Sequence, residues 1–163
     1  MDTKKTIETI DQHIGKKALM KPFGRAGSWL LLVPRDQMLS CATVLRQEKE
    51  SQFDVAETVS VHVLGDKYHL SYFLSSTHHG EHMVLRCEGL TQEIDSIEFK
   101  SLSSVWGGID LKEKEQAALF GIRFDFLSKS DSSENSKDIS IDFGLREGDY
   151  PLRKNFLWED AFL

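Results

Sequence analysis

The segment spanning residues 59–74 constrains the fold most, because it reads as two β-strands joined by a tight turn. Three valines alternate with polar residues between Val59 and Val63, which is the pattern of a strand that buries one face. A Gly-Asp pair at 65–66 follows, as is typical of a two-residue hairpin turn. After a loop at 75–81, residues 82–87 complete an antiparallel meander. The return strand of the hairpin places four large apolar side chains on one side, which must be covered: Tyr68, Leu70, Tyr72 and Leu74.

The elements expected before this meander can supply that cover. Ile7, Ile10 and Ile14 recur at helical spacing, and Gly15 is placed to end the helix. Residues 28–33 read as a buried strand. A second helix is expected to have Asp36 as its N-cap and to carry four apolar side chains on one face: Met38, Leu39, Ala42 and Leu45. The predicted fold class is α+β, a small mixed or antiparallel sheet with helices packed on one face, plus an extended C-terminal tail.

A short helix is predicted between Asp110 and Gly121. Asp110 can act as its N-cap, and Glu113 lies three residues later, which is the spacing of a capping box. Glu113 and Glu115 lie near the positive end of the helix dipole, which favours acidic side chains there. Gly121 can end the helix, because glycine accepts the left-handed C′ conformation at low cost. The acidic residues thus have a local structural explanation, which weakens any case for a catalytic role.

Composition and charge exclude several classes of function. The protein has 163 residues, 40% of them hydrophobic, which fits one domain with a substantial core. Its net charge of −6 argues against DNA or RNA binding, since nucleic-acid-binding domains carry a basic surface. The longest apolar run, residues 29–33, is far too short to span a bilayer, and the N-terminus lacks the apolar core of a signal peptide. We therefore expect a cytoplasmic protein that reaches a membrane only through partner subunits.

Cysteines and histidines give no recognisable site. Cys41 and Cys87 are too few for an iron–sulfur or structural zinc centre, so we interpret them as buried free thiols. His78, His79 and His82 cluster beside one loop, but a metal site needs at least three ligands held in a fixed geometry. Solvated loop polarity is the simpler interpretation of these histidines. No catalytic, cofactor-binding or metal-ligating residue is predicted in this protein.

Four short motifs in the second half of the sequence follow one another in order. Residues 101–106 read SLSSVW, residues 113–115 read EKE, residues 119–122 read LFGI and residues 151–156 read PLRKNF. Together they resemble the 30 kDa subunit family of NADH:quinone oxidoreductase (complex I) and of the related membrane-bound, energy-converting nickel–iron hydrogenases. That family typically shows a serine-rich strand ending in an aromatic residue, an acidic–basic–acidic triplet on a short helix, a Phe-Gly-Ile segment and a Pro-Leu-Arg-Lys-Asp-aromatic motif.

The sequence also departs from the family pattern. Ala118 and Asn155 stand where the family usually carries Asp. A Gly-His-Pro-Asp-Leu-Arg-Arg stretch that the family places after the position of Ile122 is absent, and residues 128–138 form a polar insertion instead. These departures indicate a divergent member, from a hydrogenase-type or otherwise reduced complex rather than from an ordinary complex I.

The resemblance implies a domain organisation and a function. An α+β domain like that of the 30 kDa subunit is expected over residues 1–127, followed by the polar insertion at 128–138 and an extended docking tail at 139–163. The implied function is that of a non-catalytic structural and assembly subunit in the hydrophilic arm of a complex I-like, redox-driven ion pump. The implied partners are a large subunit of the hydrogenase or quinone-site type and a small iron–sulfur subunit. The iron–sulfur clusters and the nickel–iron or quinone site would belong to these partners.

The same resemblance implies which residues contact the partners. An apolar, aromatic-rich end of the sequence and an Arg-Lys pair suit a protein interface, where Trp, Phe and Arg are enriched. Arg153 is expected to contact acidic groups or main-chain carbonyls of a neighbouring subunit, whereas Lys154 could equally be a solvated charge. The predicted interface and motif residues are Glu113, Glu115, Phe120, Gly121, Pro151, Leu152, Arg153, Lys154, Phe156 and Trp158.

Two alternatives stay open at this point. The protein could be a free-standing protein-binding module with a degenerate form of the same fold, which the exchange to Ala118 and the absent histidine–proline stretch favour. It could also be a small enzyme that uses His78, His79 or His82, for which bound stoichiometric metal would be the mark. As a subunit of an oxidoreductase complex it would have no catalytic site of its own.

Overall fold

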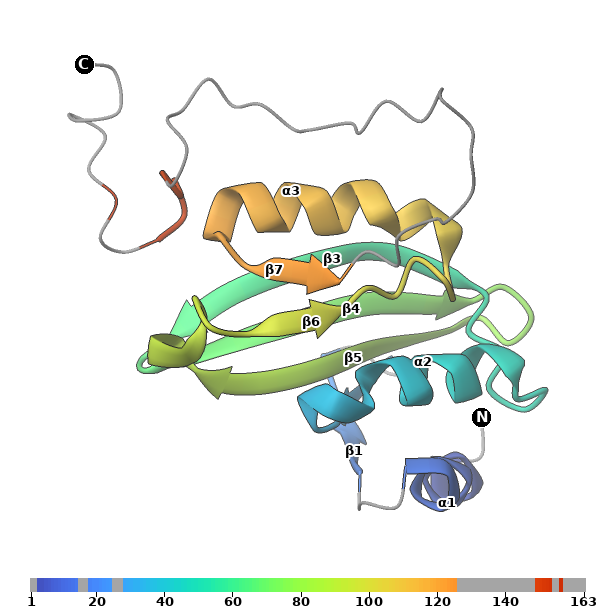
Figure 1. The fold of residues 1–163 in the computed structure, drawn as a ribbon. Coiled ribbons are helices and arrows are strands. Elements are labelled where there is room, and N and C mark those ends of the chain that lie inside the picture. Colours follow the sequence, from blue (N-terminus) through green and yellow to red (C-terminus); the bar gives the residue numbers. More distant parts are fainter. Residues whose placement is uncertain (1–2, 15–17, 25–27, 126–148, 154–155, 157–163) are drawn as a thin grey trace.

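A five-stranded mixed sheet forms the centre of the molecule (Figure 1). The computed structural model describes residues 3–14, 18–24, 28–125, 149–153 and 156. The strand order is β1-β2-β5-β4-β3, and β2 pairs with β5 in parallel while the other neighbours are antiparallel. The strands are β1 (Leu19–Pro22), β2 (Ser28–Leu32), β3 (Val55–Leu64), β4 (Lys67–Ser76) and β5 (Glu81–Leu90).

The predicted meander is confirmed as β3, β4 and β5. The backbone turns between β3 and β4 at Gly65, whose φ of 64° is in the left-handed region that a tight hairpin turn uses. The four alternating side chains of β4, from Tyr68 to Leu74, are all buried. The loop expected at 75–81 is shorter than predicted, because β4 continues to Ser76 and β5 begins at Glu81.

Helices α2 (Met38–Gln47) and α3 (Asp110–Phe120) cover the apolar face of the sheet, and α1 (Thr3–Ile14) packs against α2 (Figure 1). The expectation of helices on one face of an α+β fold is therefore confirmed. Asp36, however, is not the N-cap of α2: it lies inside a 3-10 turn at Arg35–Gln37, and α2 continues directly from that turn. The backbone is already helical at Asp36, so its side chain is not placed to accept from the N–H groups of the next turn.

A second, two-stranded parallel sheet is not among the elements that the sequence predicts. It consists of β6 (Glu98–Lys100) and β7 (Arg123–Asp125), and it lies on the same side of the main sheet as α3 (Figure 1). Phe99 of β6 and Phe124 of β7 are buried, and Phe99 meets the ring of Tyr68 edge-on at 5.8 Å between centroids. Three-residue strands are too short to give a period-two signal, which explains why the sequence does not reveal them.

Residues 101–106 are a turn and not the strand that the family pattern suggests. The backbone N–H of Ser101 bonds to the carbonyl of Asp125 in β7 at 3.3 Å, and the Ser101 hydroxyl accepts a hydrogen bond from the backbone N–H of Ser103 at 3.1 Å, where the turn begins. The motif's aromatic residue, Trp106, is buried and donates from its indole N–H to the carbonyl of Phe53 at 3.0 Å. The serines therefore shape a turn that joins β6 to α3.

Several predictions fall on residues that are not described. Gly15, the insertion at 128–138 and most of the tail at 139–163 lie outside the described residues. The division into residues 1–127, 128–138 and 139–163 thus stays a prediction. Cys41 and Cys87 are buried free thiols, as expected, and burial raises the pKa of each to about 12. Among the described helices, none is long and apolar enough to cross a membrane.

Candidate subunit interface

The first glutamate of the EKE motif is at the centre of a buried hydrogen-bond network. Glu113 has no solvent exposure. Its Oε1 accepts from the hydroxyl of Tyr72 at 2.7 Å and from the backbone N–H of Leu102 at 2.9 Å, and its Oε2 accepts from the hydroxyl of Ser101 at 2.5 Å. One carboxylate thus joins β4, the turn at 101–106 and α3. The motif therefore has a structural role within the protein itself.

Burial and hydrogen bonding act in opposite directions on this carboxyl group. Burial raises the pKa of Glu113 above its ordinary value, and the hydrogen bonds from Ser101, Leu102 and Tyr72 lower it, with a net upward shift. The pKa of Tyr72 is also raised well above its ordinary value, by burial first and then by the charge of Glu113. The Tyr72 hydroxyl therefore remains a donor to Glu113.

The capping-box prediction for α3 is wrong in its geometry. Asp110 already has helical angles, with φ −56° and ψ −41°, because a 3-10 turn at Gly107–Ile109 precedes it. Ile109 is the N-cap of α3, and its side chain makes no capping hydrogen bond. Glu113 turns inward to the buried network instead of returning to the start of the helix.

The other end of α3 matches the prediction. Gly121 is the C-cap residue in the left-handed region, with φ 67°, and its N–H bonds to the carbonyl of Ala117 at 2.7 Å. A Cβ atom added at Gly121 would come within 2.4 Å of the ring of Tyr150. Two features therefore require glycine at this position: the left-handed backbone angle and the close approach of the segment at 150–153. Phe120 is buried beside it.

The guanidinium of Arg153 bonds to this same helix end. Its Nε donates to the carbonyl of Phe120 at 2.7 Å, and its Nη2 lies 2.5 Å from the Oδ1 of Asp95 and 3.4 Å from the carbonyl of Gly121. The ring centroid of Tyr150 lies 4.4 Å from the guanidinium carbon. These contacts of Arg153 are within its own protein, and α3 supplies the kind of carbonyl that was expected on a neighbour. A contact to a partner subunit stays a prediction for this residue.

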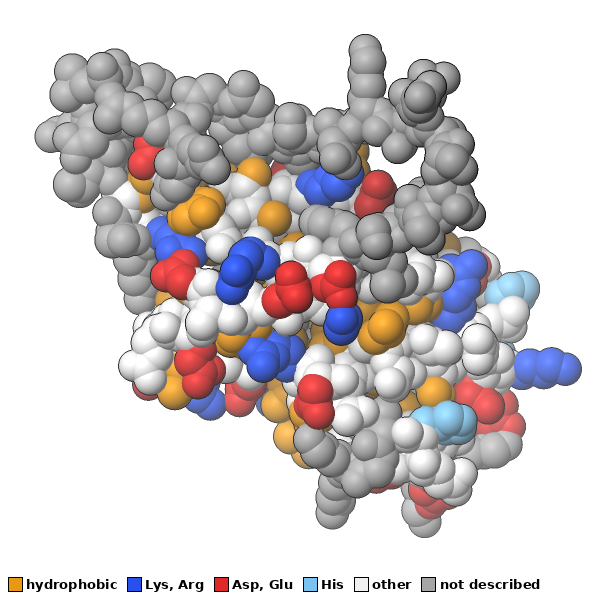
Figure 2. Space-filling view, viewed as in Figure 1, with side chains coloured by type: hydrophobic (Ala, Val, Ile, Leu, Met, Phe, Trp, Pro, Cys, Tyr) orange, Lys and Arg blue, Asp and Glu red, His pale blue; other side chains and the backbone are white. Residues whose placement is uncertain are grey.

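Some of the remaining predicted interface residues are partly or largely exposed, and the others lie outside the described residues. Leu152 is 51% exposed, and its N–H bonds to the carbonyl of Leu119 at 3.2 Å. Glu115 is partly exposed on α3, with its carboxylate 3.4 Å from the Nζ of Lys112. Pro151 and Phe156 are half-buried, whereas Lys154 and Trp158 lie outside the described residues. On the side that carries α3, acidic and basic side chains are interspersed (Figure 2).

The histidines near the turn between β4 and β5 bond to different partners. The Nε2 of His79 lies 3.1 Å from the carbonyl of Lys49, and the Nδ1 of His82 lies 3.5 Å from a carboxylate oxygen of Glu57. Within the described part of the protein, no three metal-ligating side chains come together. The geometry therefore gives no support to the small-enzyme alternative.

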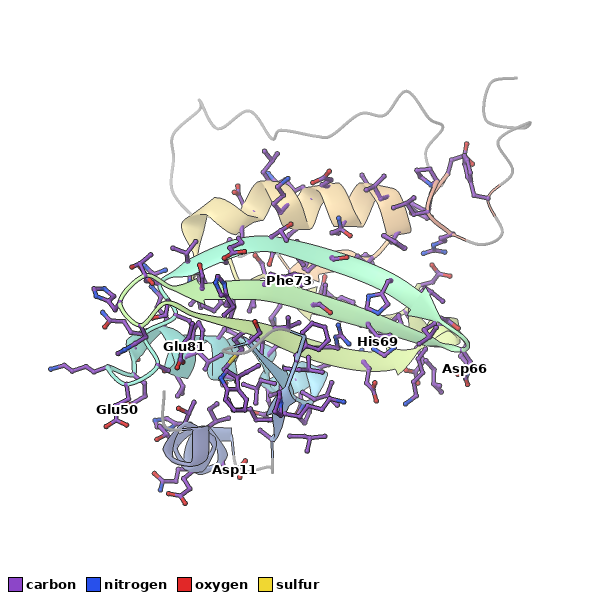
Figure 3. All side chains as sticks on the ribbon, turned by 180° about the vertical axis from the view of Figure 1, so that it is seen from behind. Asp11, Glu50, Asp66, His69, Phe73 and Glu81 are labelled. Atoms are coloured by element: carbon purple, nitrogen blue, oxygen red, sulfur yellow. The ribbon has the colours of Figure 1, made fainter. Side chains whose placement is uncertain are left out.

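Sequence reasoning missed a group of side chains on the sheet face turned away from α3, called the outer sheet face below. It is formed by alternate residues of β3, β4 and β5, and Figure 3 shows His69 and Phe73 on it. The rings of His62 and His69 stack at 4.7 Å between centroids, and Arg86 donates from Nε to the hydroxyl of Ser71 at 2.8 Å. The polar half of the period-two pattern was the available signal, because it marks the positions that point away from the core.

Comparison with known proteins identifies the family. The family model for the respiratory-chain NADH dehydrogenase 30 Kd subunit matches residues 31–161. Among solved structures, the protein is similar to a subunit of an archaeal respiratory membrane complex, the membrane-bound sulfane sulfur reductase. The TM-score is 0.70 at 18% identity, over 97% of this protein and 87% of that subunit. No curated protein matches it in sequence. The protein belongs to the family of the 30 kDa subunit of respiratory-chain NADH dehydrogenase.

Proposed function

We propose that the protein is a non-catalytic assembly subunit in the hydrophilic arm of a complex I-like, membrane-bound redox complex that drives ion translocation. The observation that carries the proposal is the family match over residues 31–161, which includes β3, β4, β5 and α3. In this role the domain docks on the large catalytic subunit of the quinone-site or hydrogenase type. It holds that subunit beside the small iron–sulfur subunit.

The internal chemistry of the protein is consistent with a structural role. The buried carboxylate of Glu113 is occupied by donors from the same fold, and burial keeps the pKa of both cysteine thiols high. Thiols with raised pKa values are poor nucleophiles and poor metal ligands at neutral pH. Iron–sulfur clusters and the nickel–iron or quinone site would therefore be held by partner subunits, and the protein would reach the cytoplasmic face of the membrane through them.

The test is recovery of the tagged protein from its own membranes in mild detergent, with mass spectrometry of the polypeptides that accompany it. The proposal expects a large quinone-type or nickel–iron-type subunit and iron–sulfur subunits in stoichiometric amounts. Which large subunit is found would decide between a quinone reductase and a hydrogenase. Recovery of the protein alone would reject the assembly role.

A truncation can test the predicted docking tail, provided that it spares the segment packed on α3. Deletion of the whole end from Tyr150 would also remove Arg153 and its bond to the carbonyl of Phe120. A stop after Phe156 removes only residues 157–163 and leaves those contacts in place. We expect this shorter protein to keep its melting temperature and to lose its partners. Normal entry into the complex would show that residues 157–163 are not a docking element.

The free-standing binding module remains the second candidate. The observation in its favour is that Glu113 and Arg153, two motif residues, bond to groups of their own protein. A motif that stabilises the fold can persist without an assembly. This candidate predicts a monomer that is recovered alone, whereas the assembly subunit is recovered with its neighbours.

A further inference from the structure

The outer sheet face carries an arginine that has few polar contacts among the described residues. Arg86 of β5 is half-buried and lies opposite Ser71 in the β4–β5 register. Its Nε donates to the Ser71 hydroxyl at 2.8 Å, and its guanidinium carbon lies 5.8 Å from the centroid of the Phe23 ring. Among the described residues, no carboxylate lies within ion-pair distance of its guanidinium. A half-buried guanidinium in this position favours an added anionic partner, since its two amino groups can bind a carboxylate.

The nearby acidic residue is already engaged by other side chains. Glu88 follows on the same face of β5, and its Oε1 lies 3.1 Å from the Nζ of Lys67. Its Oε2 lies 3.6 Å from the Nδ1 of His69. Burial lowers the pKa of Arg86 and the nearby charge of Glu88 raises it, with a net downward shift. Glu88 therefore offsets the burial of Arg86 only in part, and a carboxylate in direct contact with the guanidinium would have to come from outside the described residues.

An apolar hollow adjoins the arginine. It has a volume of about 250 Å³, and its lining includes Phe23, Phe73 and Val84. Phe73 and Val84 are register partners on β4 and β5, two positions along from Ser71 and Arg86, so the hollow and the guanidinium share one face. Phe23 is 38% exposed, and it both lines the hollow and lies near the Arg86 guanidinium. An arginine beside partly exposed aromatic and aliphatic side chains is the composition of an interface anchor.

Most charged groups of this face are balanced by one another. The Nζ of Lys67 lies 3.1 Å from Glu88, and the carboxylate of Glu57, which lines the hollow, lies 3.5 Å from His82. Within the described residues Arg86 makes no such ion pair, so its guanidinium and the adjoining hollow are complementary to a partner segment that carries a carboxylate and an apolar side chain.

We propose that the outer sheet face docks a protein segment of a partner subunit that places an Asp or Glu carboxylate on Arg86 and an apolar side chain in the adjoining hollow. The occupant is a protein, because one polypeptide segment can present both groups at once to features contributed by β4, β5 and Phe23, the residue that follows β1. The proposal rests on the proposed function in that the partner is a subunit of the same complex. It specifies that the partner contacts the outer sheet face, and that this face recognises a carboxylate and an apolar side chain.

The test uses charge reversal in the full-length protein, recovered from its own membranes. Arg86→Glu places a carboxylate against the partner's carboxylate, so we expect recovery of the partner subunits to fall by about tenfold or more relative to wild type at the same salt concentration. Lys49→Glu is the matched control, since it makes the same change of charge at an exposed position in the turn that follows α2, away from the outer sheet face and from the predicted interface residues. It should recover partners as wild type does.

A second variant keeps the proposal testable if Arg86→Glu fails to fold. Arg86→Lys retains the positive charge, and a carbodiimide would join the introduced amine to a carboxylate that lies against it. We expect an amide cross-link between position 86 and an Asp or Glu of a partner subunit, mapped by mass spectrometry. A cross-link only to Glu88 of the same protein, or none at all, would overturn the proposal.

The outcomes separate this proposal from the proposed function. If wild type recovers no partner subunits, the assembly role itself fails and the docking face with it. If wild type recovers its partners and Arg86→Glu recovers them equally well, the assembly role stands and the docking face is wrong. If the bound anion proves to be a small carboxylate amphiphile that is lost in Arg86→Glu while the subunits remain, the protein occupant is wrong.

Discussion

Glu113 and Arg86 are two charged side chains taken out of water in opposite ways. Glu113 is fully buried and receives three hydrogen bonds from its own protein. Arg86 is half-buried, and its guanidinium makes one hydrogen bond within the described residues, to Ser71. A carboxyl group whose partners are all internal is needed by the fold, because removing the side chain leaves those buried partners without an acceptor. A charge whose partners are incomplete contributes less to the fold and is suited to binding.

This difference reverses the roles that sequence motifs suggest. Glu113 of the EKE motif, which marks the family, makes its hydrogen bonds within its own protein. Arg153 of the PLRKNF motif bonds to the C-terminal end of α3. Arg86 belongs to none of the four motifs, yet it is placed for recognition. A family motif can therefore mark what the fold needs rather than what the partner touches. Substitutions at these positions test the distinction.

The largest effect is expected from Glu113→Ala. This change removes the acceptor for the Tyr72 hydroxyl, the Leu102 N–H and the Ser101 hydroxyl, and it opens a cavity beneath α3. We expect the free energy of unfolding to fall by about 3 kcal/mol or more, measured by urea denaturation. Glu115→Ala, at a partly exposed position of the same helix, is the matched control and should change stability by less than about 0.5 kcal/mol.

Glu113→Gln sharpens this prediction, because it keeps the shape of the side chain while removing its charge. The folded pKa of Glu113 is above its unfolded value, so its contribution to stability is full below the unfolded pKa and is lost as pH rises through the folded pKa. The glutamine variant should lose that part of the pH dependence. An unchanged melting temperature in Glu113→Ala would show that the hydrogen-bond network around Glu113 does not stabilise the fold.

Gly121→Val is expected to have the next largest effect. A β-branched residue resists the φ of 67°, and its Cβ would lie 2.4 Å from the ring of Tyr150. We expect a loss of about 2 kcal/mol in the free energy of unfolding. Gly121→Ala in a Tyr150→Ala background separates the two causes, since only the backbone cost of about 1 kcal/mol should remain. Equal costs with and without Tyr150 would mean that the segment at 150–153 does not pack as described.

Much of the fold could be predicted because its central elements carry strong local patterns. The β3–β4 hairpin combines alternation with a Gly-Asp turn, and the chemistry of glycine alone identifies Gly121 as the end of α3. The parallel pairing of β2 with β5 joins strands that are far apart in the sequence, and no local pattern reports such a partner. The short strands β6 and β7 give no pattern at all.

The candidate site was predicted less well, for a physical reason. Glu113 at the third position after Asp110 fits a capping box by spacing, and spacing does not say whether a side chain turns inward. Arg153 was expected to bond to carbonyls or acidic groups of a neighbour, and the carbonyls that it contacts are those of Phe120 and Gly121 in its own protein. A sequence gives the chemistry of a donor more readily than the identity of its acceptor.

Arg153→Ala should have a moderate effect. The variant loses the hydrogen bond to the carbonyl of Phe120 at the C-terminal end of α3, where a cation is favoured by the helix dipole. We expect a loss of about 1 kcal/mol in the free energy of unfolding. Asp95→Asn serves as the control, because the Asp95 side chain is 71% exposed and its pair with Arg153 should contribute less than about 0.5 kcal/mol. Stability equal to wild type in Arg153→Ala would argue against its role at the helix end.

Arg86→Gln tests the other side of the comparison. Its side chain loses the bond to Ser71 and the contact with Phe23, but no ion pair within the described residues is broken. We expect the isolated protein to change its free energy of unfolding by less than about 1 kcal/mol, in contrast to Glu113→Ala. A loss as large as that of Glu113→Ala would make Arg86 a structural residue and would weaken the case for a docking face.

The smallest effect is expected in the titration of the two stacked histidines. Burial lowers the pKa of both His62 and His69, and the charge of Arg86 lowers each further, while Glu88 raises that of His69. Both folded pKa values are below the unfolded value. The contribution of the pair to stability is therefore present above the unfolded pKa and is lost as pH falls through the folded values.

An NMR titration of the two histidines checks whether Arg86 acts on this face as a charge. In wild type, both pKa values should be below the ordinary value of 6.5. In Arg86→Gln both should move upward, because a nearby positive charge has been removed. Unchanged values in that variant would mean that the field of Arg86 does not extend over the histidine pair. The outer sheet face would then attract an acidic segment only at the guanidinium itself, and the electrostatic complementarity argued for it would be confined to that one contact.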